Sequence, residues 1–160
     1  MPSWDGFFSA EVGASAALAG LIFVGFSVNL NKIISNRRLV DRGLQSIIVL
    51  VVSLVISSAY LVPGQGSFLF GVEILIISAV AWIINTRIDV ISAKIVEKKY
   101  RVFNFLNIFS SQAALVPFIA GGIVSIFLGI AALYLLVAGI LLCYVKAIVD
   151  SWILIVEINR

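Results

Sequence analysis

The sequence predicts an all-α membrane protein, a bundle of about five transmembrane helices. Hydrophobic residues make up 62% of the 160 positions and charged residues only 12%, whereas a soluble domain is about half apolar and a quarter charged. The mean hydropathy is +1.17. A soluble core of this size cannot hide so many apolar side chains from water, so lipid must cover the remainder.

Five apolar runs give the expected helices of a single transmembrane domain, residues 1–160. At about 1.5 Å per residue, each run is long enough to cross most or all of a hydrocarbon core of about 30 Å. A short uncharged turn, PGQGS, predicts a hairpin between the second and third helices, and Gly129 marks a break before the fifth. The expected helices cover residues 7–30, 44–62, 68–85, 103–126 and 131–157.

The segment 86–102 leaves two alternatives open. Ile88, Ile91 and Ile95 are spaced like one face of a helix, which is typical of a helix lying along the membrane surface. Alternatively, the third helix continues beyond the membrane through this segment.

Rows of small residues occur in the first and last helices. In the first, Gly13 and Ala17 lie four residues apart, and Gly20 lies four residues after Ala16. This spacing lets another helix approach closely, so we expect the other helices to pack on this face.

In the last helix the row repeats every fourth residue and predicts a seam for the first helix or for a second subunit. Two such seams, and the little room for an enclosed path in one subunit, predict a homo-oligomer. The row consists of Gly139, Cys143, Ala147 and Ser151.

The charges predict orientation rather than nucleic-acid binding. Nine of the eleven Lys and Arg residues lie in the connections 31–43 and 86–101. Because cytoplasmic loops carry the excess of basic residues, the N-terminus is expected outside and the C-terminus inside.

Cofactor chemistry has little support in the composition. With no histidine and only one cysteine, Cys143, neither imidazole chemistry nor a cysteine metal cluster is available. We therefore expect no metal and no cofactor.

The sequence also lacks a nucleophile with a base, an HExxH motif and a phosphate-binding glycine loop, so we expect no enzyme.

Ionisable residues inside apolar runs are costly and suggest a role. Glu11 and Glu73 lie at matching depth on helices that run in the same direction, so they could share a proton or a cation if the helices touch. Lys146 and Asp150, one turn apart, are expected to pair as a neutralised intramembrane pair. Ser53 and Ser57, which share a protein-facing stripe with Ser46, could continue a polar path with Asn104, Asn107 and Ser111.

Two functions follow from these residues. The first is an oligomeric channel or transport protein for small ions or protons. The alternative is a non-transporting membrane protein that binds or regulates a partner through its basic loops.

Two motifs resemble a known group of proteins. SAALAGLIFVGFSVN at residues 15–29 and WILIVEINR at residues 152–160 are similar to sequences of small, uncharacterised bacterial multi-span membrane proteins. The resemblance implies a bacterial inner membrane and carries no activity with it.

The predicted orientation can be tested by cysteine labelling. Single cysteines at Gln65 and at Lys98 should react with an impermeant reagent from opposite sides of the membrane, because one helix separates them. Labelling of both positions from the same side would contradict the assignment of the third helix.

Overall fold

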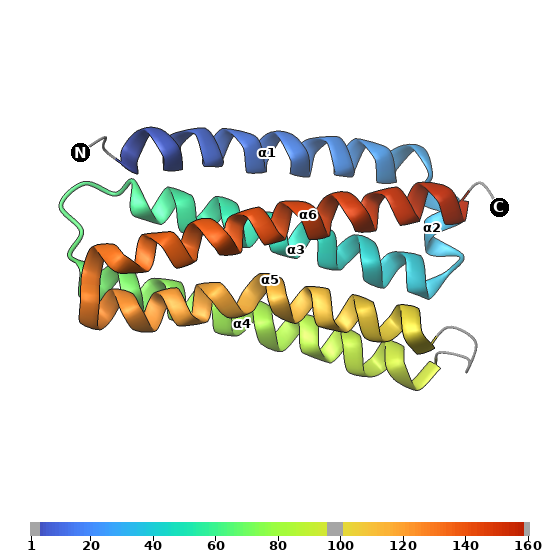
Figure 1. Cartoon of the computed structure of the whole chain (residues 1–160). Coiled ribbons are helices and arrows are strands. Elements are labelled where there is room, and N and C mark those ends of the chain that lie inside the picture. The colour runs from blue at the N-terminus through green and yellow to red at the C-terminus, as the bar shows by residue number, and fades with distance from the viewer. Residues whose placement is uncertain (1–3, 96–100, 159–160) are drawn as a thin grey trace.

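The computed structural model describes residues 4–95 and 101–158, and within these ranges every long element is an α-helix (Figure 1). Five of the helices are long and apolar enough to cross a membrane. This confirms the all-α bundle and indicates a multi-pass membrane protein. The elements are α1 (Trp4–Val28), α2 (Leu30–Ile34), α3 (Arg37–Tyr60), α4 (Ser67–Ile95), α5 (Arg101–Leu128), the 3-10 turn η2 (Gly129–Ala131) and α6 (Ala132–Ile158).

Four helices form the core and α1 is added at its side. α5 packs between α4 and α6, α3 contacts both α4 and α6, and α1 lies mainly against α3. In an apolar stretch of 18 residues of α1 only 17% of the residues are buried, compared with 50% in the corresponding stretch of α3. The bundle has a basic end, at the α1–α3 connection 29–36, and a turn end, at the α3–α4 turn 61–66 and η2 (Figure 1).

The connection between the first two long helices is more helical than expected. α3 begins at Arg37 rather than at residue 44, because the Asn36 side chain caps it by accepting a hydrogen bond from the Arg38 amide at 3.1 Å. α1 ends at Val28, and α2 occupies part of the predicted polar loop. The first two turns of α3 therefore carry basic residues into the bundle.

The segment after residue 85 continues the third long helix, since α4 runs unbroken to Ile95. Its buried side is polar: Asn85 and Asp89 are fully or almost fully buried, whereas Val90 and Ile91 are exposed. A surface helix with its isoleucines in the membrane interface is thus not what forms here. Residues 96–100, including the Lys98 labelling site, lie outside the described residues.

The two rows of small residues have different positions in the structure. No atom lies within 4 Å of a Cβ built at Gly13 or Gly20, and Ala17 is exposed. The expectation that the helices pack on this face of α1 is therefore wrong within the subunit. α1 uses its opposite face, where Phe8 and Ser15 are fully buried.

The row on α6 packs inside the subunit against α5. A Cβ at Gly139 would lie 3.0 Å from the ring of Phe118, and the Cys143 thiol donates to the Ala114 carbonyl at 3.7 Å. Ala147 is fully buried as well. At Gly139 and Cys143 the seam is therefore covered by α5, and not by α1 or a second subunit as expected.

α4 and α5 approach each other closely at two glycines. A Cβ at Gly71 would come within 2.9 Å of the Gly122 carbonyl oxygen, and one at Gly122 within 3.2 Å of the Gly71 oxygen. These two glycines let the backbones touch, which is how helices gain packing energy where lipid removes the hydrophobic drive.

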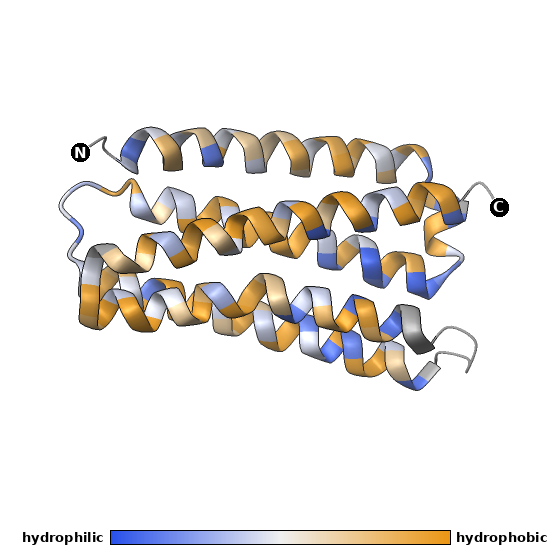
Figure 2. Cartoon of the chain, in the orientation of Figure 1, coloured by the Kyte–Doolittle hydropathy of each residue, from blue (hydrophilic) through white to orange (hydrophobic). Residues whose placement is uncertain are grey.

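Hydrophobic residues occur along every long helix, and hydrophilic ones are more frequent toward the basic end (Figure 2). Large exposed side chains such as Phe23, Phe105 and Trp152 occur on different helices. Several polar residues of these helices face inward. The predicted protein-facing stripe is confirmed, since Ser46, Ser53 and Ser57 are each fully buried. The protein is thus apolar outside and partly polar inside, as a lipid environment requires.

A matched pair of substitutions tests the two rows of small residues. Gly139→Leu should lower the unfolding midpoint in detergent, because overpacking against the Phe118 ring costs about 1–3 kcal/mol. Gly13→Leu meets open space and should leave the midpoint unchanged. If the chain forms a homo-oligomer through the free face of α1, Gly13→Leu should reduce its size in light scattering. Equal destabilisation by both variants would contradict the packing described here.

Candidate functional site

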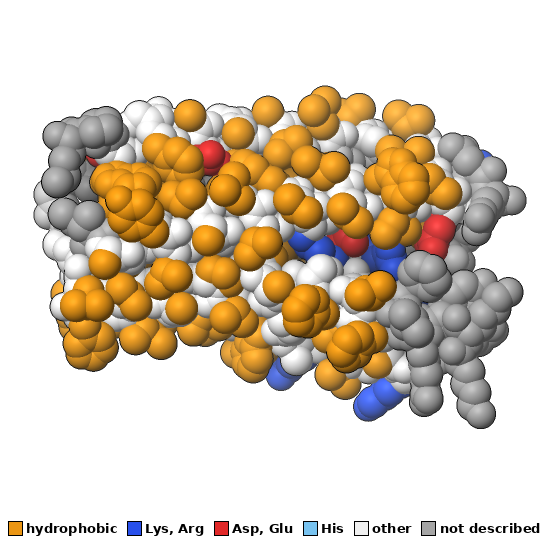
Figure 3. Space-filling view, in the orientation of Figure 1, with side chains coloured by type: hydrophobic (Ala, Val, Ile, Leu, Met, Phe, Trp, Pro, Cys, Tyr) orange, Lys and Arg blue, Asp and Glu red, His pale blue; other side chains and the backbone are white. Residues whose placement is uncertain are grey.

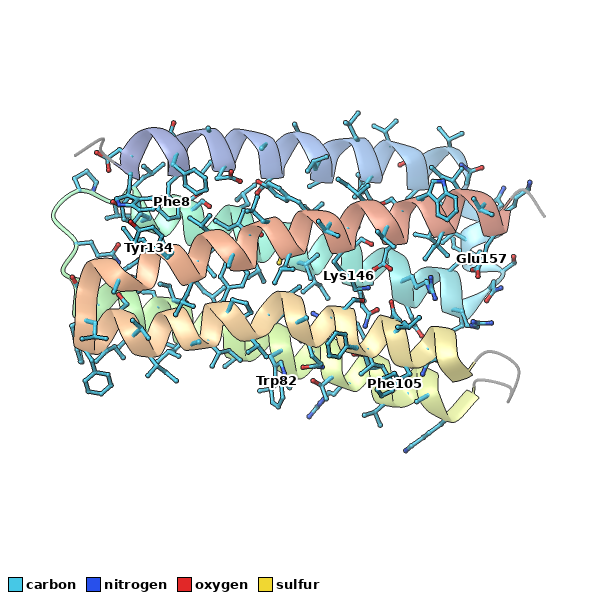
Figure 4. The ribbon with its side chains drawn as sticks, viewed as in Figure 1. Phe8, Trp82, Phe105, Tyr134, Lys146 and Glu157 are labelled. Carbon is cyan, nitrogen blue, oxygen red and sulfur yellow. The ribbon has the colours of Figure 1, made fainter. Side chains whose placement is uncertain are left out.

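A buried cluster of polar and charged side chains lies in the half of the bundle nearer to the basic end. We call it the charged cluster, and α3, α4, α5 and α6 each contribute to it. Figure 4 places Lys146 near the middle of α6, and in Figure 3 basic and acidic side chains show between hydrophobic ones on this half of the molecule. The members are Gln45, Asp89, Asn107, Lys146 and Asp150.

The ion pair between Lys146 and Asp150 is at one end of the charged cluster. The Lys146 ammonium donates to Asp150 Oδ2, and each side chain is only 3% exposed. The predicted pairing across one helical turn is confirmed. Because both charges are withdrawn from water, neither can lose its partner without a large desolvation penalty.

Two amides link this ion pair to a second carboxylate. Lys146 Nζ donates to Asn107 Oδ1 at 2.8 Å, and Asn107 Nδ2 donates to Gln45 Oε1 at 3.0 Å. Gln45 Nε2 then donates to Asp89 Oδ1 at 2.7 Å. Every bond in the chain points the same way, from the cation to the carboxylate.

The charges at the two ends determine how both amides are oriented. An ammonium group can only donate and a carboxylate can only accept, so Asn107 must present oxygen to Lys146 and Gln45 must present nitrogen to Asp89. Aligned hydrogen bonds polarise one another in a medium of low dielectric constant. A change of charge on Asp89 is therefore felt along the chain at Lys146.

Some polar atoms of this region have no hydrogen-bond partner among the described residues. Oδ2 of Asp89 and Nη1 of Arg42 are buried in this way. Buried polar atoms of native proteins are nearly always bonded, so such atoms mark a place for water, an ion or a proton.

A small cavity leads from the basic end toward Gln45 and Asn107. Its volume is about 20 Å³, enough for about one water molecule. The lining also includes Arg38, Asp41 and Arg42 from the first turns of α3, and Asp41 accepts a hydrogen bond from Ser92 at 2.7 Å. The cavity gives the charged cluster a polar side toward the basic end.

The other residues expected on helices two and four differ in their surroundings. Asn104 lines the small cavity beside Asn107. Ser53 donates to the Val49 carbonyl of its own helix at 3.1 Å, whereas Ser57 and Ser111 are buried with hydroxyl oxygens that have no partner within the described ranges. Asn104 and Asn107 thus belong to the region of the charged cluster, and the serines lie in the interior.

The two glutamates predicted to act together have separate partners. Glu11 on α1 accepts a hydrogen bond from the Tyr144 hydroxyl of α6 at 2.5 Å, and Ser15 joins them, its hydroxyl 2.9 Å from that of Tyr144. Glu73 on α4 accepts from Gln65 in the α3–α4 turn at 2.5 Å. The expectation that Glu11 and Glu73 share a proton or a cation is not met, because α1 packs on α3 and α4 packs on α5.

The sequence does not predict a role in a site for Gln45, Arg42 or Asp89. Asp89 falls within the basic connection 86–101. However, Asn85, Asp89 and Ser92 are spaced by four and three residues and so share one helix face. That polar face inside a long apolar helix was the available signal. Gln45 gave none, since only its tertiary partners distinguish it from a residue at the membrane boundary.

No group of three or more acidic, Cys or His side chains within residues 4–95 and 101–158 could hold a metal ion. The charged cluster offers charges of both signs instead, with Lys146 and Arg42 near Asp89 and Asp150.

Comparison of the chain with protein-family models, curated proteins and solved structures finds no match. The resemblance of the two terminal motifs to small bacterial membrane proteins stays a prediction.

A double-mutant cycle tests the ion pair. Lys146→Met or Asp150→Leu alone should destabilise the protein by about 3–5 kcal/mol, because each leaves a buried charge without its partner. The double variant should recover most of that loss. Unfolding in detergent measures all three, and Lys94→Met, a change at an exposed lysine, serves as the control. Losses that simply add in the double variant would contradict the pairing.

Proposed function

We propose that this protein moves protons or small ions across a membrane and that the charged cluster is the site where they bind. The observation that carries the proposal is the buried carboxylate of Asp89, with one oxygen bonded to Gln45 and the other without a partner among the described residues. Charged side chains inside membrane helices are rare and mark ion pathways and proton relays by default.

The chain of amides supports a coupled site rather than a static one. A proton or cation at Asp89 removes the charge on which the Gln45–Asn107 chain ends. The other end of that chain holds Lys146, so its pairing with Asp150 responds. Four helices meet in these contacts, and a change at one carboxylate can therefore alter how the helices pack.

A small cavity beside the charged cluster supports access from the basic end as part of this proposal. The cavity lined by Arg38, Asp41 and Arg42 leads toward Gln45, and the buried Asn85 and Ser111 offer further polar atoms deeper in the bundle. Basic residues at the mouth would influence which ions approach.

We also propose that the protein lies in a bacterial inner membrane, with its N-terminus outside and the basic end in the cytoplasm. The proposal also includes self-association, for which the free face of α1 at Gly13, Ala17 and Gly20 is the surface that remains after the α6 seam is occupied. Rows of small residues favour helix association in lipid.

Flux measurements in liposomes test the function. The reconstituted protein should move protons, followed with a pH-sensitive dye under an imposed potential, or one of the ions Na⁺, K⁺ and Cl⁻. Asp89→Asn should abolish the flux, because the amide can still accept from Gln45 but cannot bind a proton. Glu157→Gln, at an exposed position of α6, should leave it unchanged.

The charge-free double variant Lys146→Met/Asp150→Leu separates transport from structure. If it folds and conducts like the unaltered protein, the charged cluster is structural and the proposal fails. Silence of the unaltered protein for protons, cations and anions would favour the alternative, a protein that binds or regulates a partner.

A further inference from the structure

The turn end of the bundle holds a second polar cavity, separate from the charged cluster. Its volume is about 210 Å³, and since a water molecule occupies about 30 Å³ of liquid, the cavity has room for a molecule of several heavy atoms. We call it the turn-end pocket. Its lining comes from α3, the α3–α4 turn, α4, α5, η2 and α6, and includes Tyr60, Gln65, Ser67, Phe70 and Ser125.

The side chain of Gln65 is held in one orientation. Its Nε2 donates to Glu73 Oε2 at 2.5 Å, and a carboxylate accepts hydrogen bonds but does not donate them. The amide therefore cannot flip, and Oε1 is directed away from Glu73. That oxygen is buried and has no hydrogen-bond partner in the described part of the chain. Because Gln65 is one of the residues that line the turn-end pocket, an unused acceptor lies at the wall of this pocket.

The remaining lining is suited to a cation. Ser125 donates its hydroxyl proton to the Ser67 carbonyl at 3.1 Å. The rings of Tyr60 and Phe70 meet edge to face with centroids 5.7 Å apart, and aromatic faces attract ammonium groups. Stacking of Tyr60 on Phe8 of α1, at 4.1 Å between centroids, holds its ring in place.

The charge around the turn-end pocket has one sign. Glu73 lies one hydrogen bond behind Gln65, and Asp5 is close enough to Tyr60 to act on it electrostatically. No Lys or Arg occurs in residues 1–31, 43–86 or 102–145 of the sequence, which are the stretches that form this end. A cation is therefore attracted, and an anion is repelled.

We propose that the turn-end pocket binds a small primary ammonium ion. The ammonium group donates to Gln65 Oε1 under the influence of the Glu73 charge, and a short alkyl part contacts Tyr60 and Phe70. This site does not depend on the proposed transport function, because binding requires only the folded bundle.

Calorimetric titration of the detergent-purified protein with methylammonium chloride tests the site, with sodium acetate titrated at equal ionic strength to probe anion binding. Gln65→Leu should weaken methylammonium binding about tenfold or more, because it removes a charge-assisted hydrogen bond. Glu73→Gln, which keeps an acceptor for Gln65 but loses the charge, should weaken it less. Gly66→Ala, at a position with no atom within 4 Å, is the matched control and should bind normally.

If Gln65→Leu does not fold, Ser67→Leu provides the second variant, since it fills the turn-end pocket without touching the amide. Absence of methylammonium binding to the unaltered protein, unchanged binding in the variant that folds, or preferential binding of acetate would each overturn the inference. Liposome flux is not part of this measurement, so failure of the transport proposal would leave its result intact.

Discussion

The ion pair between Lys146 and Asp150 is the interaction on which the arrangement of the helices depends. Two charges that are almost fully buried are stable in a membrane interior only when their remaining hydrogen-bonding capacity is used. Asn107 supplies that for Lys146, Gln45 supplies it for Asn107, and Asp89 ends the chain. One residue from each of α3, α4 and α5 must therefore meet α6 at the same level. α1 supplies none, which agrees with its place outside this four-helix core.

Lipid contact explains why polar and apolar faces are reversed relative to a soluble bundle. Neighbouring positions show it directly: Lys146 is 4% exposed and Val145 is 60% exposed. A lipid-covered surface gains nothing from burying valine, whereas a charge must be enclosed. Helix contacts are then decided by shape, and the pair Gly71 and Gly122 brings α4 and α5 together where larger residues would keep them apart.

The sequence is sufficient to predict features that depend on a single helix. Hydropathy and helical spacing predict the five apolar runs, the buried serines of α3 and the pair Lys146–Asp150. Features that depend on contacts between two helices were not predicted. The row at Gly13 and Gly20 has the spacing of an interface but meets no neighbour in the subunit, and Asp89 was read as a loop residue because its amide partner is 44 positions away. The sequence also predicts a loop where the charged first turns of α3 form, because the capping by Asn36 is not evident from hydropathy.

Apolar and polar side chains both fill the interior between the charged cluster and the turn-end pocket. On every core helix a fully buried apolar residue lies between its part of the charged cluster and its part of the turn-end pocket. These residues are Leu50, Ile74, Leu115 and Ile140, each 0% exposed. The fully buried Ser53, Ser57 and Ser78 lie between the same two regions, so this interior combines packed apolar residues with polar ones. Under the transport proposal, an ion that passes between the two ends displaces these packed side chains, as a carrier that alternates between states would allow.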